Sequence, residues 1–339
     1  MGLISFTEKG FYCEKAKVYI DPWKPVRKAL ITHAHADHSR GGMKHYLAHP
    51  HSIPVMKHRL GEISVQPIDY AESININGVK ITFYPAGHVP GSAQIKLEDK
   101  SESWVISGDY KLGYDGVSTP FESVKCSHFI TESTFGLPIY NWDPQAEVMS
   151  AINKWWIQNA KEGITSIMLG YSFGKAQRIL ANIDSSIGEI FVHGAIHHTN
   201  NALKNAGYTF PKTEYVSNET DKSRFKGALI LAPPSALGSS WLRKFKPYKT
   251  ATASGWMALR GARRRRNVDK GFVLSDHADW KDLNRAVIES GAENVYATHG
   301  YSSVFAKWLN STGLNAQVVK TAFEGELSEI GESLSSESE

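Results

Sequence analysis

The sequence has little cysteine and lacks long uninterrupted hydrophobic runs. Only Cys13 and Cys126 occur in 339 residues, which excludes a disulfide framework and a cysteine-rich zinc module. The N-terminal segment MGLISFTEKGFYC lacks the basic start and apolar stretch of a signal peptide, and no run approaches the length of a membrane span. We therefore expect a folded, soluble, cytoplasmic protein that does not enter a membrane.

A strong excess of charge of one sign is also missing. The chain has 38 Lys and Arg residues against 34 Asp and Glu residues, a net charge of +4. Many of the acids lie in the final stretch ELSEIGESLSSESE, so the rest of the chain is more basic than the total indicates. A polyanionic partner is compatible with this balance, and the Ser- and Glu-rich residues 326–339 are expected to form a disordered acidic tail.

The order of short apolar segments predicts an α/β chain with an insertion. The first part reads as strands that end on His, Asp or Glu, and Asn77-Gly78 in ININGVKITFYPAGH predicts a hairpin turn. From about residue 138, strand and helix patterns alternate, which favours a parallel α/β unit. Strand-ending polar residues return after residue 269. We expect residues 1–137 and 269–325 to form one domain, with 138–268 inserted into it.

The motif ITHAHADHSRGG carries the strongest chemical signal. His33, His35, Asp37 and His38 fall within six residues at the end of an apolar strand. Alternate side chains of an extended segment share a face, so His33 and His35 can bind one ion, while Asp37 and His38, past the turn, bind a second. Imidazole and carboxylate ligands suit zinc or manganese, and two ions about 3.5–4 Å apart can stabilise both oxygens of an in-line displacement. The alternative is chance clustering among 14 histidines.

Three further residues of ligand type follow in order, each at the end of an expected strand. They are His88 in PAGHVPGS, Asp109 in SGDY and His299 in THG. Taken singly, each has an ordinary alternative as a turn residue, a cap or a core histidine. In series with the first motif they predict a site with two divalent metal ions that hydrolyses phosphodiester or amide bonds.

Residues suited to phosphate contact lie in the expected insertion. Guanidinium groups make paired hydrogen bonds to phosphate, and strand-to-helix junctions favour anions. The candidates are Ser172 and Lys175 in GYSFGKAQ, Ser235 in APPSALGSS, and the run Arg263, Arg264, Arg265 and Arg266. Ordinary caps and turns are the alternative for the first three, and a solvated surface is the alternative for the arginines.

The run HAHADH, followed by GH, SGD, TEST, SDHAD and THG, resembles the β-CASP branch of the metallo-β-lactamase superfamily up to about residue 325. The phrases YIDPWKPVRKALITHAHADH, FITESTFGLP, LAPPSALGSSWLRKF and ASGWMALRGARRRR resemble the bacterial DNA-ligase-associated exonucleases. The resemblance implies a metallo-β-lactamase αββα sandwich with an inserted β-CASP domain. It also implies a two-metal-dependent DNA exonuclease of DNA repair, with DNA as substrate and a DNA ligase and helicase as partners.

Carried over by position, the resemblance implies a role for each motif residue. One metal is bound by His33, His35 and His88, and the other by Asp37, His38 and His299, with Asp109 bridging. Asp21 matches an acidic residue that orients a ligand histidine. The catalytic residues are Asp37, Glu132 and His277, with His277 as general acid positioned by Glu132. Two alternatives stay open: His277 orients the phosphate without transferring a proton, or a metal contacts the leaving oxygen.

Three other functions compete with a DNA exonuclease. A histidine in the position of His299 is typical of RNA-processing β-CASP enzymes, which favours an RNA endo- or exonuclease. A small-molecule metallo-hydrolase on the same fold is less favoured, because the insertion and the arginine run suit a polyanion. A non-catalytic scaffold is disfavoured because every expected ligand is present.

Overall fold

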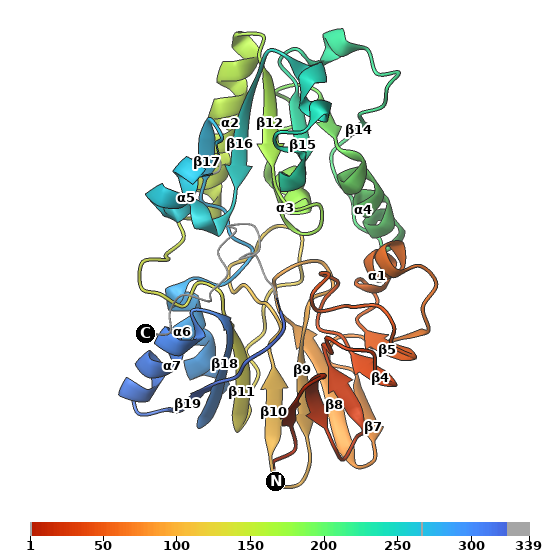
Figure 1. Ribbon diagram of the computed structural model, residues 1–339, viewed down its shortest axis with the longest axis vertical. Helices are drawn as coiled ribbons and strands as arrows, with labels where there is room; N and C mark the ends of the chain where they lie inside the picture. The colour runs from red at the N-terminus through yellow and green to blue at the C-terminus, as the bar shows by residue number, and fades with distance from the viewer. Residues whose placement is uncertain (1, 266, 324–339) are drawn as a thin grey trace. The chain divides into compact units, whose positions relative to one another are not determined.

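This computed structural model describes residues 2–265 and 267–323, and they fall into two compact units (Figure 1). Unit 1 contains residues 2–114, 118–141 and 277–323, and unit 2 contains residues 115–117 together with 142–276. Both units combine strands with helices, so the predicted α/β class is confirmed.

Unit 1 contains two sheets. The first has the order β1 (Ser5–Thr7), β2 (Gly10–Cys13), β3 (Val18–Ile20), β4 (Lys28–Leu30), β5 (His45–Ala48) and β6 (Val65–Pro67). The second has the order β19 (Asn315–Val318), β18 (Asn294–Gly300), β11 (His128–Ser133), β10 (Ser103–Ile106), β9 (Ala93–Glu98), β8 (Val79–Pro85) and β7 (Ser73–Ile76). The β7–β8 hairpin turns at Asn77 and Gly78, whose φ angles are 54° and 79°, as predicted.

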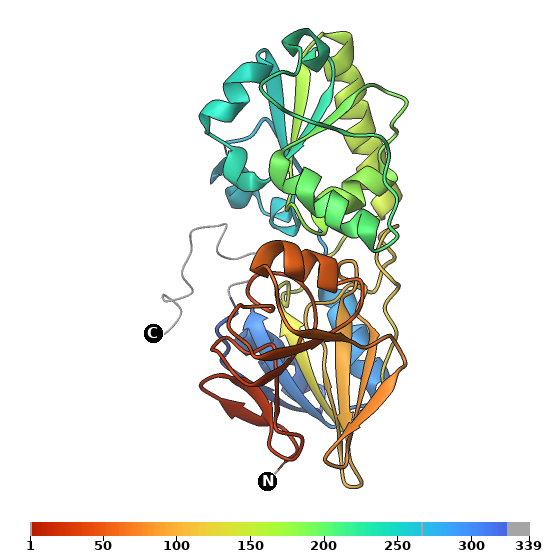
Figure 2. The same cartoon turned by 90° about the vertical axis from the view of Figure 1, so that its right-hand side faces the viewer.

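The core of unit 1 lies between its two sheets. Phe11 and Ile20 of the first sheet share one apolar cluster with Ile81 and Ile95 of the second, and Figure 2 shows these strands from the side. The opposite face of the second sheet packs on α6 (Trp280–Ser290) and α7 (Ser302–Ser311). A further helix, α1 (Ile53–Leu60), follows β5. In β10, β11 and β18, successive residues alternate between the two apolar clusters.

Unit 2 is built on a parallel sheet. Its strand order is β14 (Glu214–Tyr215), β13 (Ile190–Val192), β15 (Leu229–Ala232), β12 (Thr165–Leu169), β16 (Tyr248–Ala253) and β17 (Lys270–Phe272). One face packs on α2 (Gln145–Lys161) and α3 (Lys175–Asn182), and the other packs on the short helices η1 (Lys222–Phe225), η2 (Pro234–Ala236) and η3 (Ser240–Phe245). The remaining helices of this unit are α4 (Gly194–Asn205), η4 (Gly255–Ala258) and α5 (Arg260–Arg265). Burial on both faces is typical of parallel sheets.

The boundaries of the units differ from the expected residues 137 and 269. β17 pairs with β16, so residues 270–276 join unit 2. Asn182 and Gln145 donate side-chain hydrogen bonds to the carbonyl of Asp115, which attaches residues 115–117 to the same unit. The assignment of the units to named domains stays a prediction, and the expected tail 326–339 lies outside the described residues.

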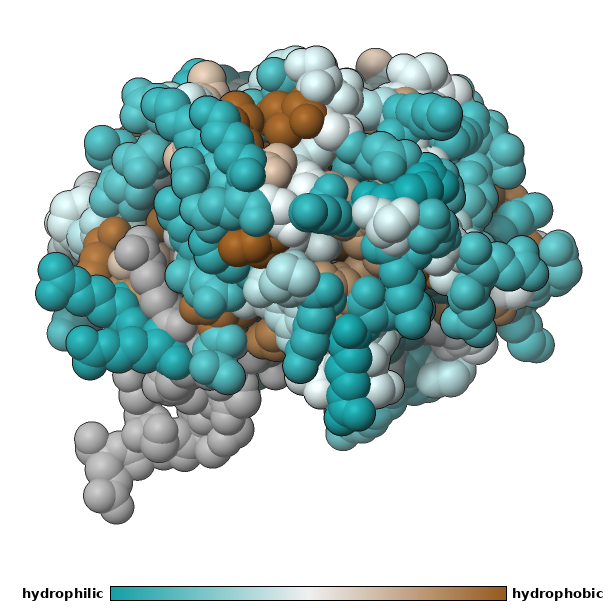
Figure 3. Space-filling view, turned by 90° about the horizontal axis from the view of Figure 1, so that it is seen from above, coloured by the Kyte–Doolittle hydropathy of each residue, from teal (hydrophilic) through white to brown (hydrophobic). Residues whose placement is uncertain are grey.

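The described helices are all too short or too polar to cross a membrane. The face drawn in Figure 3 is mainly hydrophilic, with small and separate hydrophobic patches.

Candidate metal centre

The predicted ligands of unit 1 meet where its strands end. His33, His35 and His38 follow β4, His88 follows β8, and Asp109 follows β10, whereas His299 is the penultimate residue of β18. Most of these side chains are buried; His33 is 0% exposed and Asp109 is 4% exposed. Because buried polar groups need partners, the geometry among them decides what the site can hold.

Two glycines let the backbone bring the ligand segments together. Gly108 has a φ of 56°, and a Cβ there would lie 2.6 Å from Oγ1 of Thr32. Gly300 has a φ of 73°, and a Cβ there would lie 2.3 Å from the carbonyl oxygen of Ser133. Both positions combine a left-handed backbone with a close approach that only glycine tolerates. The close approach of Gly108 to Thr32 therefore positions the next residue, Asp109, and that of Gly300 to Ser133 positions the preceding residue, His299.

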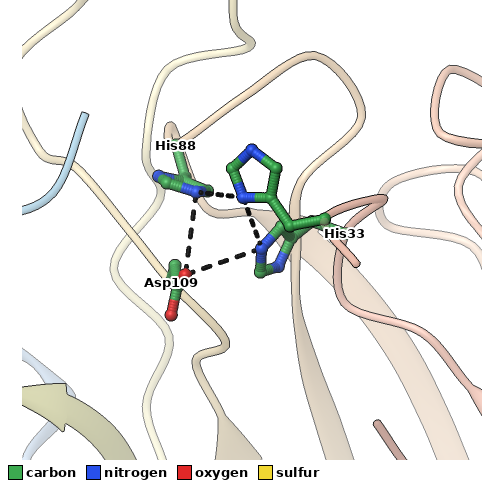
Figure 4. A group of neighbouring side chains, drawn as sticks. His33, His88 and Asp109 are labelled. Atoms are coloured by element: carbon green, nitrogen blue, oxygen red, sulfur yellow. Dashed lines mark hydrogen bonds and ion pairs between the residues drawn. The ribbon is translucent and has the colours of Figure 1, made fainter. Parts of the chain in front are cut away.

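The first group of ligands consists of His33, His35, His88 and Asp109. Nδ1 of His35 lies 3.1 Å from Nε2 of His33 and 3.2 Å from Nε2 of His88. Oδ2 of Asp109 lies 3.5 Å from Nε2 of His33 and 3.7 Å from Nε2 of His88. Figure 4 shows His33, His88 and Asp109 turned toward one another. One nitrogen or oxygen from each residue lies within 4.8 Å of all the others, so this group could hold a metal ion.

The second group consists of His38, Asp109 and His299. Oδ1 of Asp109 lies 3.1 Å from Nε2 of His299 and 3.6 Å from Nε2 of His38. These three buried atoms have no hydrogen-bond partner within the described residues, although leaving a buried polar atom unpaired costs about 1–3 kcal/mol. Oδ2 of Asp37 lies 3.7 Å from Nε2 of His38, at the side of this group. Unpaired nitrogen and oxygen atoms that converge in this way fit a divalent metal ion.

The charges around His38 favour a cation at the same place. Burial by itself lowers the pKa of His38, but Asp109, Asp37 and Asp21 together raise that pKa to about 10. Burial raises the pKa of Asp109, but His38 and His299 outweigh it and hold that pKa well below its ordinary value. An ionised carboxylate in a buried site requires a nearby positive charge, which either a proton or a metal ion can supply.

Asp21 contacts the Nδ1 side of His38, opposite the nitrogen that faces the second group. Its carboxylate accepts hydrogen bonds from Nδ1 of His38 at 2.8 Å and from the backbone N–H of Thr32 at 2.8 Å. This contact directs Nε2 of His38 into the second group, which is the arrangement by which a second carboxylate orients a ligand imidazole. Asp21 has a φ of 41°, a left-handed conformation that is uncommon outside glycine and that clusters at functional sites.

Glu132 and His277 form a pair beside the two groups. Nδ1 of His277 donates to the carboxylate of Glu132, with distances of 2.8 and 3.0 Å to its two oxygens. The carboxylate also accepts hydrogen bonds from the backbone N–H of Tyr110 at 2.7 Å and from the hydroxyl of Thr134. Glu132, His277 and Asp109 offer atoms within 4.8 Å of one another. The pair is therefore rigid, buried and adjacent to the shared aspartate.

The predicted phosphate-binding residues lie in unit 2. Ser235 is exposed on η2, Ser172 is half-buried before α3, and Arg264 is exposed on α5. Arg266 and the side chains of Arg263 and Arg265 lie outside what the structure describes. The role of these serines and arginines in nucleic-acid binding stays a prediction.

The predicted phosphate contact is wrong for Lys175, because its ammonium group is buried inside unit 2. Its side chain is 0% exposed, and Nζ donates to the carbonyl of Leu274 at 2.7 Å and lies 3.0 Å from Oδ2 of Asp276. Arg178 lies 3.0 Å from the other oxygen of Asp276. The ammonium group is thus used inside unit 2, because it compensates a buried carboxylate.

Phe323 is part of the site but was not predicted from the sequence. Its ring stacks on the imidazole of His38, with centroids 4.2 Å apart and an interplanar angle of 11°. It also packs edge-on against Trp23 at 5.6 Å and Phe11 at 6.1 Å. Arg40 holds the preceding residue through a hydrogen bond of 2.7 Å to the carbonyl of Ala322. Together these contacts set the plane of the His38 ring.

We expect Phe323→Ala to weaken metal binding at the second group by about tenfold, the lower end of the effect of removing an outer-shell partner. The reason is that His38 loses the stacked ring that limits its rotation. Calorimetric titration of the metal-free protein with zinc measures the affinity of each group. Phe323→Tyr keeps the ring and serves as the control. Unchanged affinity in Phe323→Ala would show that Asp21 alone positions His38.

Comparisons with known proteins find relatives among DNA ligases and endoribonucleases. The chain is 29% identical to a probable DNA ligase of Opitutus terrae, over 91% of this chain and 30% of that protein. It is 27% identical to the endoribonuclease YSH1 of Gibberella zeae, over 52% of this chain and 21% of that one, and 22% identical to YSH1 of Eremothecium gossypii, over 70% and 38%. The chain thus spans less than two fifths of the length of each relative. No family model matches it.

A solved structure shares the fold. A protein of unknown function from Enterococcus faecalis superposes with a TM-score of 0.57 at 10% identity, covering 80% of this chain and 74% of that one. The sequence relatives confirm the predicted resemblance to β-CASP nucleases of the metallo-β-lactamase fold, and the strand-end cluster of histidines and aspartates is compatible with it. Two of the relatives named above are endoribonucleases, and one is a probable DNA ligase.

Proposed function

We propose that this chain is a metal-dependent nuclease that hydrolyses phosphodiester bonds in DNA from an end, as part of DNA repair. The observation that supports this most is the shared position of Asp109. Its two oxygens face separate histidine groups, and the Glu132–His277 pair lies within 4.8 Å of it. Such a site can bind a phosphodiester from two sides and can exchange a proton with it.

The residues fit two metal ions. One would be held by His33, His35 and His88, and the other by Asp37, His38 and His299, with Asp109 common to both. Nitrogen and oxygen ligands suit zinc or manganese. Bound there, the two ions would supply Lewis acidity for the attack of water on phosphorus. Asp21 accepts a hydrogen bond from Nδ1 of His38, so Nε2 is the nitrogen left to bind a metal. Burial keeps competing solvent away from the ligands.

His277 is suited to act on the leaving oxygen. Because Nδ1 donates to Glu132, Nε2 is the nitrogen that can exchange a proton with a substrate oxygen. Glu132 is itself held by Tyr110 and Thr134, so the orientation of the imidazole is set before substrate binds. We assign His277 as general acid and Glu132 as the residue that positions it.

We also propose that unit 1 is a metallo-β-lactamase αββα sandwich and unit 2 its β-CASP insertion. The packing of two sheets, with α6 and α7 outside the second, supports the first assignment. The similarity to a probable DNA ligase supports the subgroup of ligase-associated exonucleases, with a ligase and a helicase as partners of a cytoplasmic enzyme. Residues Ser172, Ser235, Arg263, Arg264, Arg265 and Arg266 remain the proposed phosphate contacts.

RNA is the second candidate substrate. The observations that favour it are the similarity to two YSH1 endoribonucleases and the presence of a histidine at position 299 within the second metal group. An RNA nuclease would use the same metal site, so only the substrate separates the two proposals.

A cleavage assay separates them. The protein is incubated with manganese or zinc and with matched DNA and RNA strands that carry a label at either end, together with a closed circle of single-stranded DNA. We expect the linear DNA to shorten from one end while the RNA and the circle survive. Cleavage of RNA would favour the second candidate, and cleavage of the circle would exclude an exonuclease. Absence of any cleavage with either metal would contradict the nuclease proposal.

A further inference from the structure

Aromatic and imidazole rings gather at one edge of the parallel sheet of unit 2. His193 directly follows β13 and caps α4, and Tyr215 is the last residue of β14. The two strands are neighbours, with Val192 opposite Tyr215. Ligands of parallel α/β sheets bind at the carboxyl ends of the strands, which is where these rings lie.

The rings form a row of two contacting pairs. His193 lies 4.9 Å from Trp241 between ring centroids, at an angle of 73°. The ring of Tyr215 covers Gly194, where a Cβ would lie only 3.2 Å from Cε2. His197 lies 5.3 Å from Tyr215 on the other side. The row therefore consists of the pair Trp241–His193 and the pair Tyr215–His197. Tyr215 approaches the first pair through Gly194, the residue that directly follows His193.

The row is open to solvent and lies next to a cation. Tyr215 is 44% exposed, and Trp241, His193 and His197 are half-buried. Nζ of Lys244 lies 5.6 Å from the centroid of Trp241. Burial and Lys244 lower the pKa of His193, and burial, His198 and Lys204 lower the pKa of His197, which favours the neutral form of both imidazoles. Neutral flat rings beside a lysine are the combination that binds unpaired bases and their phosphates.

We propose that Tyr215, His193 and Trp241 form a platform on which unpaired nucleobases of the substrate strand stack, with Lys244 against the phosphate backbone. This deepens the proposed function and rests on it, because it names the part of a single strand that unit 2 recognises. Every base offers a flat face, so such a platform accepts any sequence, as a degrading enzyme requires. The competing explanation is that the rings only pack the surface, as Trp241 does against Phe245 at 4.7 Å.

The test compares a strand that has bases with one that lacks them. Fluorescence anisotropy in metal-free buffer measures binding of labelled oligothymidylate and of an abasic strand of equal length. We expect Tyr215→Ala to weaken oligothymidylate binding about tenfold and to leave the abasic strand unaffected. Tyr215→Phe keeps the ring and should bind as the wild type does. Tyr114→Ala, which removes a tyrosine that is 61% exposed in unit 1, is the matched control.

A second variant tests the cation independently. We expect Lys244→Gln to weaken binding of both strands and to flatten the salt dependence, because it removes a charge and no ring. A stacking role is overturned if Tyr215→Ala binds oligothymidylate as the wild type does, or if it loses affinity for both strands equally. Binding of oligouridylate tests RNA. If Tyr215→Ala loses as much affinity for oligouridylate as for oligothymidylate, the platform accepts either sugar. Wild-type protein that neither binds nor cleaves any strand would instead refute the proposed nuclease function.

Discussion

Asp109→Asn is expected to eliminate hydrolysis and to lower the metal content of both ligand groups. Oδ2 of Asp109 faces His33 and His88, and Oδ1 faces His38 and His299. Asparagine keeps the shape of the side chain but removes the charge and places N–H donors where ligands are needed. Loss of several kcal/mol of transition-state stabilisation corresponds to a fall in rate of about a thousandfold or more.

Metal content measured by mass spectrometry, together with the rate on labelled DNA, checks this expectation. Asp69→Asn is the control, because the side chain of Asp69 is 73% exposed and the substitution is chemically identical. We expect the control to retain full metal content and rate. An Asp109→Asn protein that still binds two ions per chain and cleaves normally would show that Asp109 is not shared between two metals.

The metal ligands could be predicted from the sequence because they follow a local rule. Each stands where an apolar strand ends, and HAHADH places four potential ligand residues on one short segment. The structure brings His33, His35 and His88 together with Asp109 on one side, and His38 and His299 on the other. The spacing of the motifs indicates that these side chains lie at the ends of strands. Their metal binding itself stays a prediction.

The parts that could not be predicted depend on contacts between distant segments. Phe323 follows β19 in a stretch without periodicity, and nothing nearby in sequence indicates that its ring stacks on His38. Lys175 stands at the start of a helix, where a lysine can point outward to an anion or inward to a carboxylate. The partner that decides this is Asp276, which is distant in the sequence, because it is the last residue of unit 2. Burial of the pair follows from tertiary packing alone.

The sheet of unit 2 shows the same limit for secondary structure. The alternation of apolar segments predicted a parallel α/β unit, and parallel pairing of β12 with β15 and β16 agrees with it. Unit 2 extends beyond residue 268 because β17 pairs with β16, and a strand of three residues has no local signature in the sequence.

His277→Ala is expected to keep both metals while turnover falls by about a hundredfold to ten-thousandfold, the usual contribution of general acid–base catalysis. The imidazole is held by Glu132 beside the metal groups and is only 2% exposed. Glu132→Gln keeps an acceptor for Nδ1 of His277 and should reduce the rate less than removal of the ring does. Loss of metal from His277→Ala would instead identify His277 as a ligand, since its group with Asp109 and Glu132 has that geometry.

The leaving group of the substrate separates proton transfer from phosphate positioning. A nucleotide ester of p-nitrophenol releases an anion that is stable without a proton, whereas a natural strand releases a sugar alkoxide that needs one. If His277 is the general acid, His277→Ala should be slow on DNA and near wild type on the nitrophenyl ester. An equal loss on both substrates would mean that the imidazole orients the phosphate. Glu132 supports either role, because a carboxylate at Nδ1 both sets the direction of the ring and stabilises its protonated form.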